Sequence, residues 1–175
     1  MINFRLLTEK DIEVKVKQVK ENGAVLLLYK TARTDMDILD ETVGATNWTN
    51  DYREIKGNLY CGLAVRETDD APFIWKWDCG IESREDGDGN EKKGEASDAF
   101  KRAGFRWGIG RELYSAPFIW IPADKMNISP MGKDKFKTYD SFSVEKIAYG
   151  EDNRISGLAI WNNKTGKRVF VWQRT

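Results

Sequence analysis

Residues 92–114 read KKGEASDAFKRAGFRWGIGRELY, and this stretch decides how the rest of the chain is interpreted. Apolar residues recur in it at intervals of three or four, which is the period of an amphipathic α-helix. These residues are Ala96, Phe100, Ala103 and Trp107. The glycines of the segment Gly108-Ile-Gly110 are typical of a helix C-terminus. The sequence therefore predicts one long helix that packs by a single apolar face.

The other side of this predicted helix is charged and carries Asp98, Lys101, Arg102 and Arg106. Arg102 and Arg106 are four residues apart, so they lie one above the other, and like charges in this arrangement slightly destabilise an isolated helix. A crowded cationic surface of this kind indicates an anionic partner. The alternative is an ordinary solvated surface on which Asp98 pairs with Arg102.

Three β-strands are predicted upstream of the helix, at residues 48–55, 59–66 and 73–82. Apolar and polar residues alternate there with a period of two, which is the signature of a strand. Trp75 and Trp77 lie on the same face of the last strand. We expect the helix to cover this aromatic face, so that the two tryptophans form core. A surface that stacks nucleobases is the alternative.

The elements on either side of this block complete the expected architecture. The Asn22-Gly23 pair predicts a hairpin between two early strands. A helix is expected after it, capped by Thr34, with Met36, Leu39 and Val43 on its apolar face and Gly44 at its end. Further strands are expected at residues 116–121, 141–149, 154–161 and 167–172, and loops at 83–93 and 123–137. The order predicts an α+β fold with an antiparallel β-β-β-α core, a preceding helix and a C-terminal β-meander.

Composition and charge narrow the function classes. The 175 residues include 28 basic and 28 acidic side chains, so any nucleic acid must be bound by a local groove and not by the field of the whole molecule. There is no histidine, which makes hydrolase triads and zinc sites unexpected. No phosphate-binding loop that ends in Gly-Lys-Ser/Thr occurs, so we expect no ATP use, no cofactor and no metal.

The same features bear on location. Cys61 and Cys79 do not form a disulfide framework and are expected to be buried thiols in strands. No signal peptide and no apolar run of membrane length is visible. We therefore expect a cytoplasmic protein, in a bacterial cell or a phage-infected host, without membrane contact.

Two motifs make the chain resemble the Rad-fifty-two/Sak superfamily of single-strand annealing proteins, most closely its short phage and bacterial members. The first is Tyr29-Lys-Thr-Ala-Arg33, followed by Leu39-Asp-Glu-Thr-Val-Gly44 and Trp48. The second runs from Lys93 to Tyr114 and is the more specific of the two. The resemblance covers residues 25–120, which implies a single domain over residues 1–175 with an annealing core at 25–120 and a C-terminal β extension at 121–175.

The resemblance implies an oligomeric ring or filament that binds single-stranded DNA and anneals complementary strands without ATP, in recombination and repair. The protein is then not an enzyme, and a host single-strand-binding protein is a further candidate partner. Arg33, Lys101 and Arg102 match the cationic residues that line the family's DNA groove. A further groove arginine of the family falls near Phe105, beside Arg106, and Ala45 stands where eukaryotic members have an aromatic residue. The supporting cationic candidates are Lys30, Lys92, Lys93 and Arg111, with Lys76 and Arg84 behind them.

Two other classes of function remain open. The order helix-β-β-β-helix also describes a double-stranded RNA-binding domain, although this chain is longer and continues into another meander. A metal-dependent nuclease is the second alternative, because Asp78 with Glu91 and Lys93 could hold Mg²⁺ and orient water.

Overall fold

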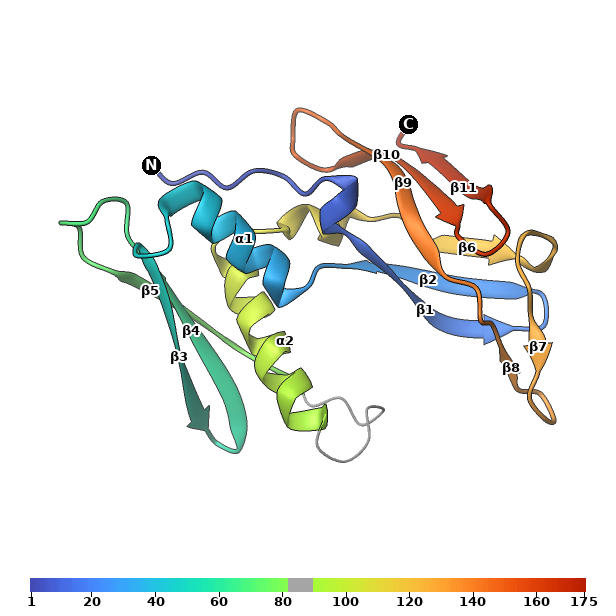
Figure 1. Ribbon diagram of the computed structural model, residues 1–175, viewed down its shortest axis with the longest axis horizontal. Coiled ribbons are helices and arrows are strands. Elements are labelled where there is room, and N and C mark those ends of the chain that lie inside the picture. The colour runs from blue at the N-terminus through green and yellow to red at the C-terminus, as the bar shows by residue number, and fades with distance from the viewer. Residues whose placement is uncertain (82–89) are drawn as a thin grey trace. The chain divides into compact units, whose positions relative to one another are not determined.

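The computed structural model describes residues 1–81 and 90–175, and its helices and antiparallel sheets confirm the α+β fold. The chain forms two compact units (Figure 1). Unit 1 comprises Met1–Leu6 and Lys30–Arg111, and unit 2 comprises Leu7–Tyr29 and Glu112–Thr175. Residues 25–29 and 112–120, which the resemblance assigned to the annealing core, thus belong to unit 2. The single domain with its boundary at residue 120 stays a prediction.

Unit 1 contains a three-stranded antiparallel sheet in the order β3-β4-β5. The strands are β3 (Trp48–Ile55), β4 (Asn58–Val65) and β5 (Ile74–Cys79). The turn between β3 and β4 places Lys56 and Gly57 at φ 53° and 78°, and two successive residues with positive φ suit the twist of a tight hairpin. All three predicted strands of this meander are therefore present.

Helix α2 (Asn90–Arg106) covers one face of this sheet and contacts β4 and β5. Of the predicted apolar face it buries Phe100 and Ala103, and it also buries Ala99, which was not predicted. Ala96 is only half-buried, and Trp107, just beyond the end of the helix, is half-buried as well. Residues 90–93 belong to the helix, so the loop predicted for 83–93 is wrong at its end. Residues 83–89 of that predicted loop lie outside the described residues.

The sheet presents to α2 the face opposite to the expected one. The side chains that contact the helix come from Trp48, Tyr52, Lys76 and Asp78. Trp75 and Trp77 alternate with Lys76 and Asp78 along β5, so they lie on the outer face. The prediction that the helix buries the two tryptophans is wrong. Alternation located the aromatic face, but it could not show which face the helix covers.

Helix α1 (Ala32–Val43) contacts α2 and lies beside it in Figure 1. Its N-cap is Thr31, whose hydroxyl accepts the Thr34 N–H at 3.3 Å, so the predicted cap at Thr34 is wrong by three residues. Gly44 ends the helix with φ 85°, as expected. Leu39 is buried as predicted, but Met36 is exposed and Asp35 and Ile38 are buried instead. A carboxylate on the inner side of this helix is the unexpected feature of unit 1.

Unit 2 is built on a six-stranded antiparallel sheet in the order β11-β10-β9-β1-β2-β6. The predicted hairpin at Asn22-Gly23 joins β1 to β2, and its outer edges pair with β9 and β6. The hairpin and the C-terminal meander therefore form one sheet, a connection that the sequence did not reveal. The strands are β1 (Glu13–Lys20), β2 (Gly23–Tyr29), β6 (Ile119–Pro122), β9 (Phe142–Tyr149), β10 (Ile155–Asn162) and β11 (Lys167–Gln173).

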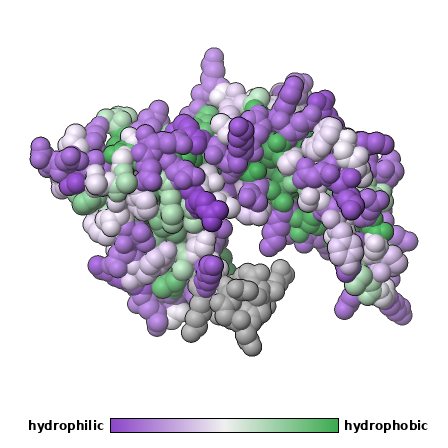
Figure 2. Space-filling view, in the orientation of Figure 1, coloured by the Kyte–Doolittle hydropathy of each residue, from purple (hydrophilic) through white to green (hydrophobic). Residues whose placement is uncertain are grey.

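Short elements connect these strands. The region predicted to be irregular, 123–137, contains a turn of 3-10 helix and a small hairpin whose two strands are each two residues long. The remaining short elements are η1 (Glu9–Asp11), η2 (Arg111–Ser115), η3 (Ala123–Lys125), β7 (Ser129–Pro130) and β8 (Phe136–Lys137). Figure 2 shows that hydrophilic residues dominate the visible surface and that hydrophobic residues form small patches among them. Within the part of the chain that the structure describes, no helix is both long and apolar enough to cross a membrane.

Candidate nucleic-acid interface

A buried ion pair lies where the start of α1 meets α2. Lys30 is only 2% exposed, and its Nζ donates to both carboxylate oxygens of Asp35, at 2.6 and 2.5 Å. The same ammonium donates to the main-chain carbonyl of Lys101 at 3.1 Å and lies 4.1 Å from the centre of the Phe105 ring. Lys30, which precedes the N-cap of α1, therefore ties the first turn of α1 to two successive turns of α2.

The carboxylate of this pair is held in a tight, apolar site. Burial raises the pKa of Asp35 from 3.8 to about 6, and the nearby Lys30 and Lys101 oppose that rise only in part. Gly104 of α2 makes the close approach possible, because a Cβ atom there would lie 2.8 Å from Asp35 Oδ2 and 3.3 Å from Lys30 Nζ. The glycine in the segment Lys101-Arg-Ala-Gly104 is thus a packing requirement of the pair.

The buried position of Lys30 does not support its predicted role as a DNA contact. Its ammonium faces Asp35 and the interior, so it has no access to a phosphate, and breaking the pair would leave a buried charge without its partner. Lys30 is a positioning residue that fixes the first turn of α1 against α2. The sequence holds one signal for this role, since a lysine follows the apolar strand 24–29 directly and an aspartate comes five residues later.

The three residues with the closest match to the family's groove lie around this pair. Arg33 is exposed in the first turn of α1, two residues before Asp35. Lys101 is half-buried on α2, and its carbonyl is the one that Lys30 binds. Arg102 follows it directly. Helices α1 and α2 contact each other, and Lys30 bonds both to Asp35 and to the Lys101 carbonyl. The turns that carry Arg33 and Lys101 are therefore neighbours.

Arg102 and Arg106 form a row of ion pairs on the side of α2 that faces the end of β5. The Nε of Arg102 donates to Asp98 at 2.9 Å, and the Nε of Arg106 donates to Asp78 at 3.0 Å. Asp98 also accepts the backbone N–H of Ile81 at 2.9 Å. The pairing of Asp98 with Arg102, which the sequence left open, is therefore present. Both pairs are partly exposed, and exposed pairs are weak enough to exchange with other anions.

Two further cations stabilise the end of α2. Arg111 donates to the carbonyls of Phe105 and Arg106 at 2.8 to 3.2 Å, and Lys76 donates to the carbonyl of Arg106 at 3.2 Å. Cations at the last carbonyls of a helix stabilise it. The Lys76 ammonium also lies 4.3 Å from the Trp107 ring. The sequence treated these residues as candidate DNA contacts and missed their capping role.

The remaining candidates are less informative. Lys93 is exposed in the first turn of α2, and the side chain of Lys92 and all of Arg84 lie outside the described residues. For the nuclease alternative, Asp78 is engaged by Arg106, and the described side chains contain no group of three or more acidic, cysteine or histidine residues that could hold a metal. Glu91 lies outside the described side chains, so that alternative stays untested.

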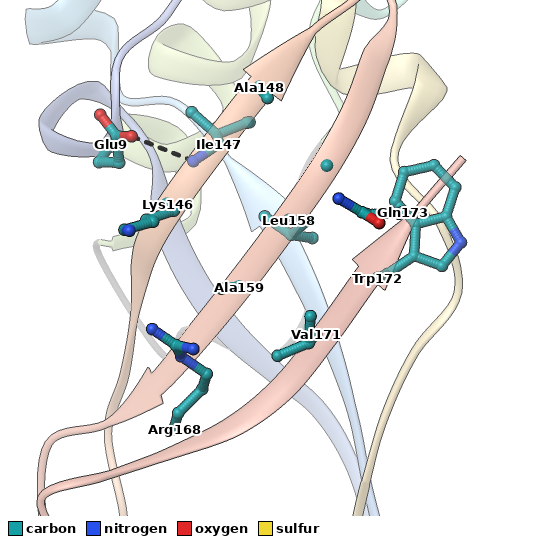
Figure 3. Close-up of a pocket in the computed structure, with 11 residues that line it drawn as sticks. Glu9, Lys146, Ile147, Ala148, Leu158, Ala159, Arg168, Val171, Trp172 and Gln173 are labelled. Atoms are coloured by element: carbon teal, nitrogen blue, oxygen red, sulfur yellow. Dashed lines mark hydrogen bonds between the residues drawn. The ribbon is translucent and has the colours of Figure 1, made fainter. Parts of the chain in front are cut away.

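A cavity of about 440 Å³ lies in unit 2, on β9, β10 and β11 (Figure 3). Small and apolar residues line it, among them Ala148, Leu158 and Val171, with Lys146 and Arg168 alongside. Glu9 accepts the Ile147 N–H at 3.0 Å at the edge of this cavity. None of the predicted site residues lines it, so it offers no support for the predicted groove.

Comparison of the chain with protein-family models, curated proteins and solved structures gave no match in any of the three. The resemblance to the Rad-fifty-two/Sak superfamily therefore stays a prediction.

Proposed function

We propose that this protein binds single-stranded DNA and anneals complementary strands without ATP, in recombination or repair. The observation that carries the proposal is the Lys30–Asp35 pair. It fixes Arg33 at the start of α1 near the turn of α2 that carries Lys101 and Arg102. Cations from two helices are in this way presented by a rigid scaffold, and such preorganisation lowers the cost of binding an extended anion.

The chemistry of annealing suits this arrangement. Two strands can pair only if their backbone charges are neutralised while the bases stay free, and lysine and arginine neutralise phosphates by displacing counterions without reading sequence. The partly exposed pairs of Arg102 and Arg106 fit the same role, because phosphates can replace Asp98 and Asp78 at low energetic cost. Binding is then expected to be independent of sequence and to weaken steeply with salt.

Several parts of the proposal concern assembly. A short groove on one subunit holds few nucleotides, so a homo-oligomeric ring or filament would supply the avidity that annealing requires. A host single-strand-binding protein remains a proposed partner, and a cytoplasmic location a proposed compartment. The C-terminal strands of unit 2 have no assigned part in the reaction.

The test is the annealing rate of two complementary labelled oligonucleotides, without nucleotide or metal. We expect the parent to accelerate annealing, and Lys101→Ala/Arg102→Ala to lose most of this acceleration while it keeps its unfolding temperature. The matched control is Lys133→Ala/Lys135→Ala, which removes two exposed lysines from unit 2 and should anneal like the parent. Affinity for single strands is measured in parallel over a salt titration.

Each outcome has a defined meaning. Tight binding without faster annealing would indicate a module that only protects single strands. Equal loss in both double variants would show that the effect reflects total charge and not the α1–α2 site. Absence of binding by the parent would contradict the proposal, as would a preference for duplex RNA over single-stranded DNA.

A further inference from the structure

The outer face of the β3-β4-β5 sheet carries a row of aromatic side chains along β5. Trp75 and Trp77 are two residues apart on β5 and share this face, and Phe73 comes two residues before Trp75, just ahead of the strand. Opposite the tryptophans, β4 has Ala64 and Gly62. A Cβ atom at Gly62 would lie 2.5 Å from the Trp77 ring, so this indole lies directly against the bare backbone of the central strand. The small residues of β4 thus let the indoles lie close to the sheet.

The two indoles are arranged as a stack. Their ring centroids are 5.7 Å apart with an interplanar angle of 20°. Trp75 is the outer member and is 42% exposed. Large aromatic side chains are usually mostly buried, and exposed ones with a flat, accessible surface are enriched at binding sites. Trp75 therefore offers a flat apolar surface to a ligand.

Guanidinium groups lie over this row at both ends. The Arg53 guanidinium is 4.7 Å from the Trp77 ring, and the Arg66 guanidinium is 4.7 Å from the Phe73 ring. Arg66 is held by hydrogen bonds to Asn47, to the carbonyl of Thr46 and to that of Asp69, so it fixes the ring beneath it. The Arg53 side chain is 65% exposed, and its ion pair with Asp51 is a long one of 3.3 Å. Arg53 is thus placed to contact an anion beside the stack.

The combination of an exposed aromatic ring with charged side chains makes a nucleic acid a better ligand for this face than an apolar protein surface. The core of a protein–protein interface is depleted of charge, whereas Thr49, Asp51 and Arg53 line this face beside the aromatic row. Platforms for single strands combine exposed aromatic rings, which stack on any base, with cations that contact the backbone. Aromatic residues two apart on a β-strand are spaced along its length. The successive bases of an extended single-stranded nucleic acid are likewise spaced along its backbone, so a row of such rings suits this ligand.

We propose that this outer face binds single-stranded nucleic acid by stacking unpaired bases on Trp75, with Arg53 beside the backbone. The inference rests on the proposed function and adds to it, because the α1–α2 cations neutralise phosphates whereas this face contacts bases. Stacking occupies the flat face of a base and leaves its hydrogen-bonding edge free to pair, and it does not depend on base identity. It is therefore compatible with annealing of any sequence.

The experiment measures the affinity of labelled oligo-dT and of an abasic oligomer of equal length and charge. The variants are Trp75→Ala, Trp75→Phe and the control Ile74→Ala. Ile74 is the neighbouring residue on the opposite face and is also exposed, at 57%. We expect Trp75→Ala to weaken oligo-dT binding by about 5- to 150-fold, the range found for loss of one stacking side chain, and to leave the abasic oligomer unaffected. Trp75→Phe should keep most of the affinity, and Ile74→Ala all of it.

The outcomes separate this inference from the function on which it rests. If the parent binds neither oligomer, the proposed function itself is wrong. If the parent binds and Lys101→Ala/Arg102→Ala weakens binding while Trp75→Ala does not, the groove stands and the stacking surface is overturned. If Trp75→Ala instead changes the oligomeric state in sedimentation and leaves oligo-dT affinity intact, the face is a contact between copies of the chain. Unfolding temperatures of the three variants show that each loss occurs in folded protein.

Discussion

Unit 1 contains ion pairs of similar chemistry in two opposite environments. Lys30 and Asp35 are buried beneath the start of α1, with the ammonium bound to both carboxylate oxygens. On the side of α2 near β5, Arg102 pairs with Asp98 and Arg106 with Asp78 in contact with water. The buried pair fixes the position of two helices, whereas the exposed pairs leave their cations accessible. A cationic residue in a motif can therefore position the site or contact the ligand, and burial decides between the two roles.

A substitution in the buried Lys30–Asp35 pair should lower the free energy of unfolding most. Lys30→Met keeps the length of the side chain and removes its charge, which leaves the Asp35 carboxylate buried without its partner. We expect the free energy of unfolding to fall by about 3–5 kcal/mol, as for other broken buried pairs. Urea unfolding at pH 7, followed by circular dichroism, measures this difference.

The double variant Lys30→Met/Asp35→Leu is the matched control for this substitution. It replaces the whole pair by apolar side chains, and buried pairs replaced in this way are often neutral or stabilising. We expect it to regain the stability of the parent and to bind oligo-dT with parental affinity. Loss of DNA affinity in this folded variant would show that the charged pair itself is required for binding, beyond its contribution to stability.

The pH dependence of stability tests the environment of Asp35. Burial raises its pKa to about 6, so the folded protein binds this proton more tightly than the unfolded chain, in which the value is near 3.8. The stabilisation linked to this proton is therefore complete below about pH 4 and is lost as the pH rises through 6. Relative to Asp35→Asn, the parent should lose on the order of 3 kcal/mol over this range.

This measurement compares the two proteins by urea unfolding at several values between pH 4 and 7. Carboxylates with lowered pKa values, such as Asp140, change stability in the opposite direction. They are common to both proteins and cancel in the difference. A difference that stays constant, or that favours the parent increasingly as the pH rises, would contradict the raised pKa of Asp35.

Substitutions in the exposed ion pairs should change stability least. Arg106 is 59% exposed, and Arg106→Ala is expected to change the free energy of unfolding by less than about 1 kcal/mol. If Arg106 contacts a phosphate, the slope of log affinity against log salt should fall by about 1 in this variant. A large loss of stability would instead make the pair with Asp78 structural, and the difference from the buried pair would disappear.

Local patterns in the sequence were sufficient for most of the fold. Alternation located β3, β4 and β5, the Asn22-Gly23 pair located the first hairpin, and helical spacing located α2. The patterns did not reveal which strands pair across long sequence distances, such as β1 with β9 and β2 with β6. They also assigned α2 to the wrong face of its sheet, because both faces of β5 carry large side chains and alternation alone does not rank them.

The sequence predicted which residues belong to the candidate site, but it did not predict how they are arranged in space. The motifs identified Arg33, Lys101 and Arg102, and the structure holds the first two near one ion pair. The sequence holds only one signal for the buried position of Lys30, its place directly after an apolar strand with Asp35 five residues later. This signal alone did not separate Lys30 from the exposed cations of the motif. The outward position of Trp75 likewise depended on which side α2 packs, a property of tertiary contacts.

The division of the chain between the two units has a consequence for folding. The chain passes from one unit to the other after Leu6, after Tyr29 and again after Arg111. The β1–β2 hairpin is therefore synthesised early, but its neighbours β6 and β9 follow about a hundred residues later, which makes its sheet a slow, high-contact-order assembly. During this interval both outer strands of the hairpin have open hydrogen-bonding edges, the feature that promotes pairing between nascent chains.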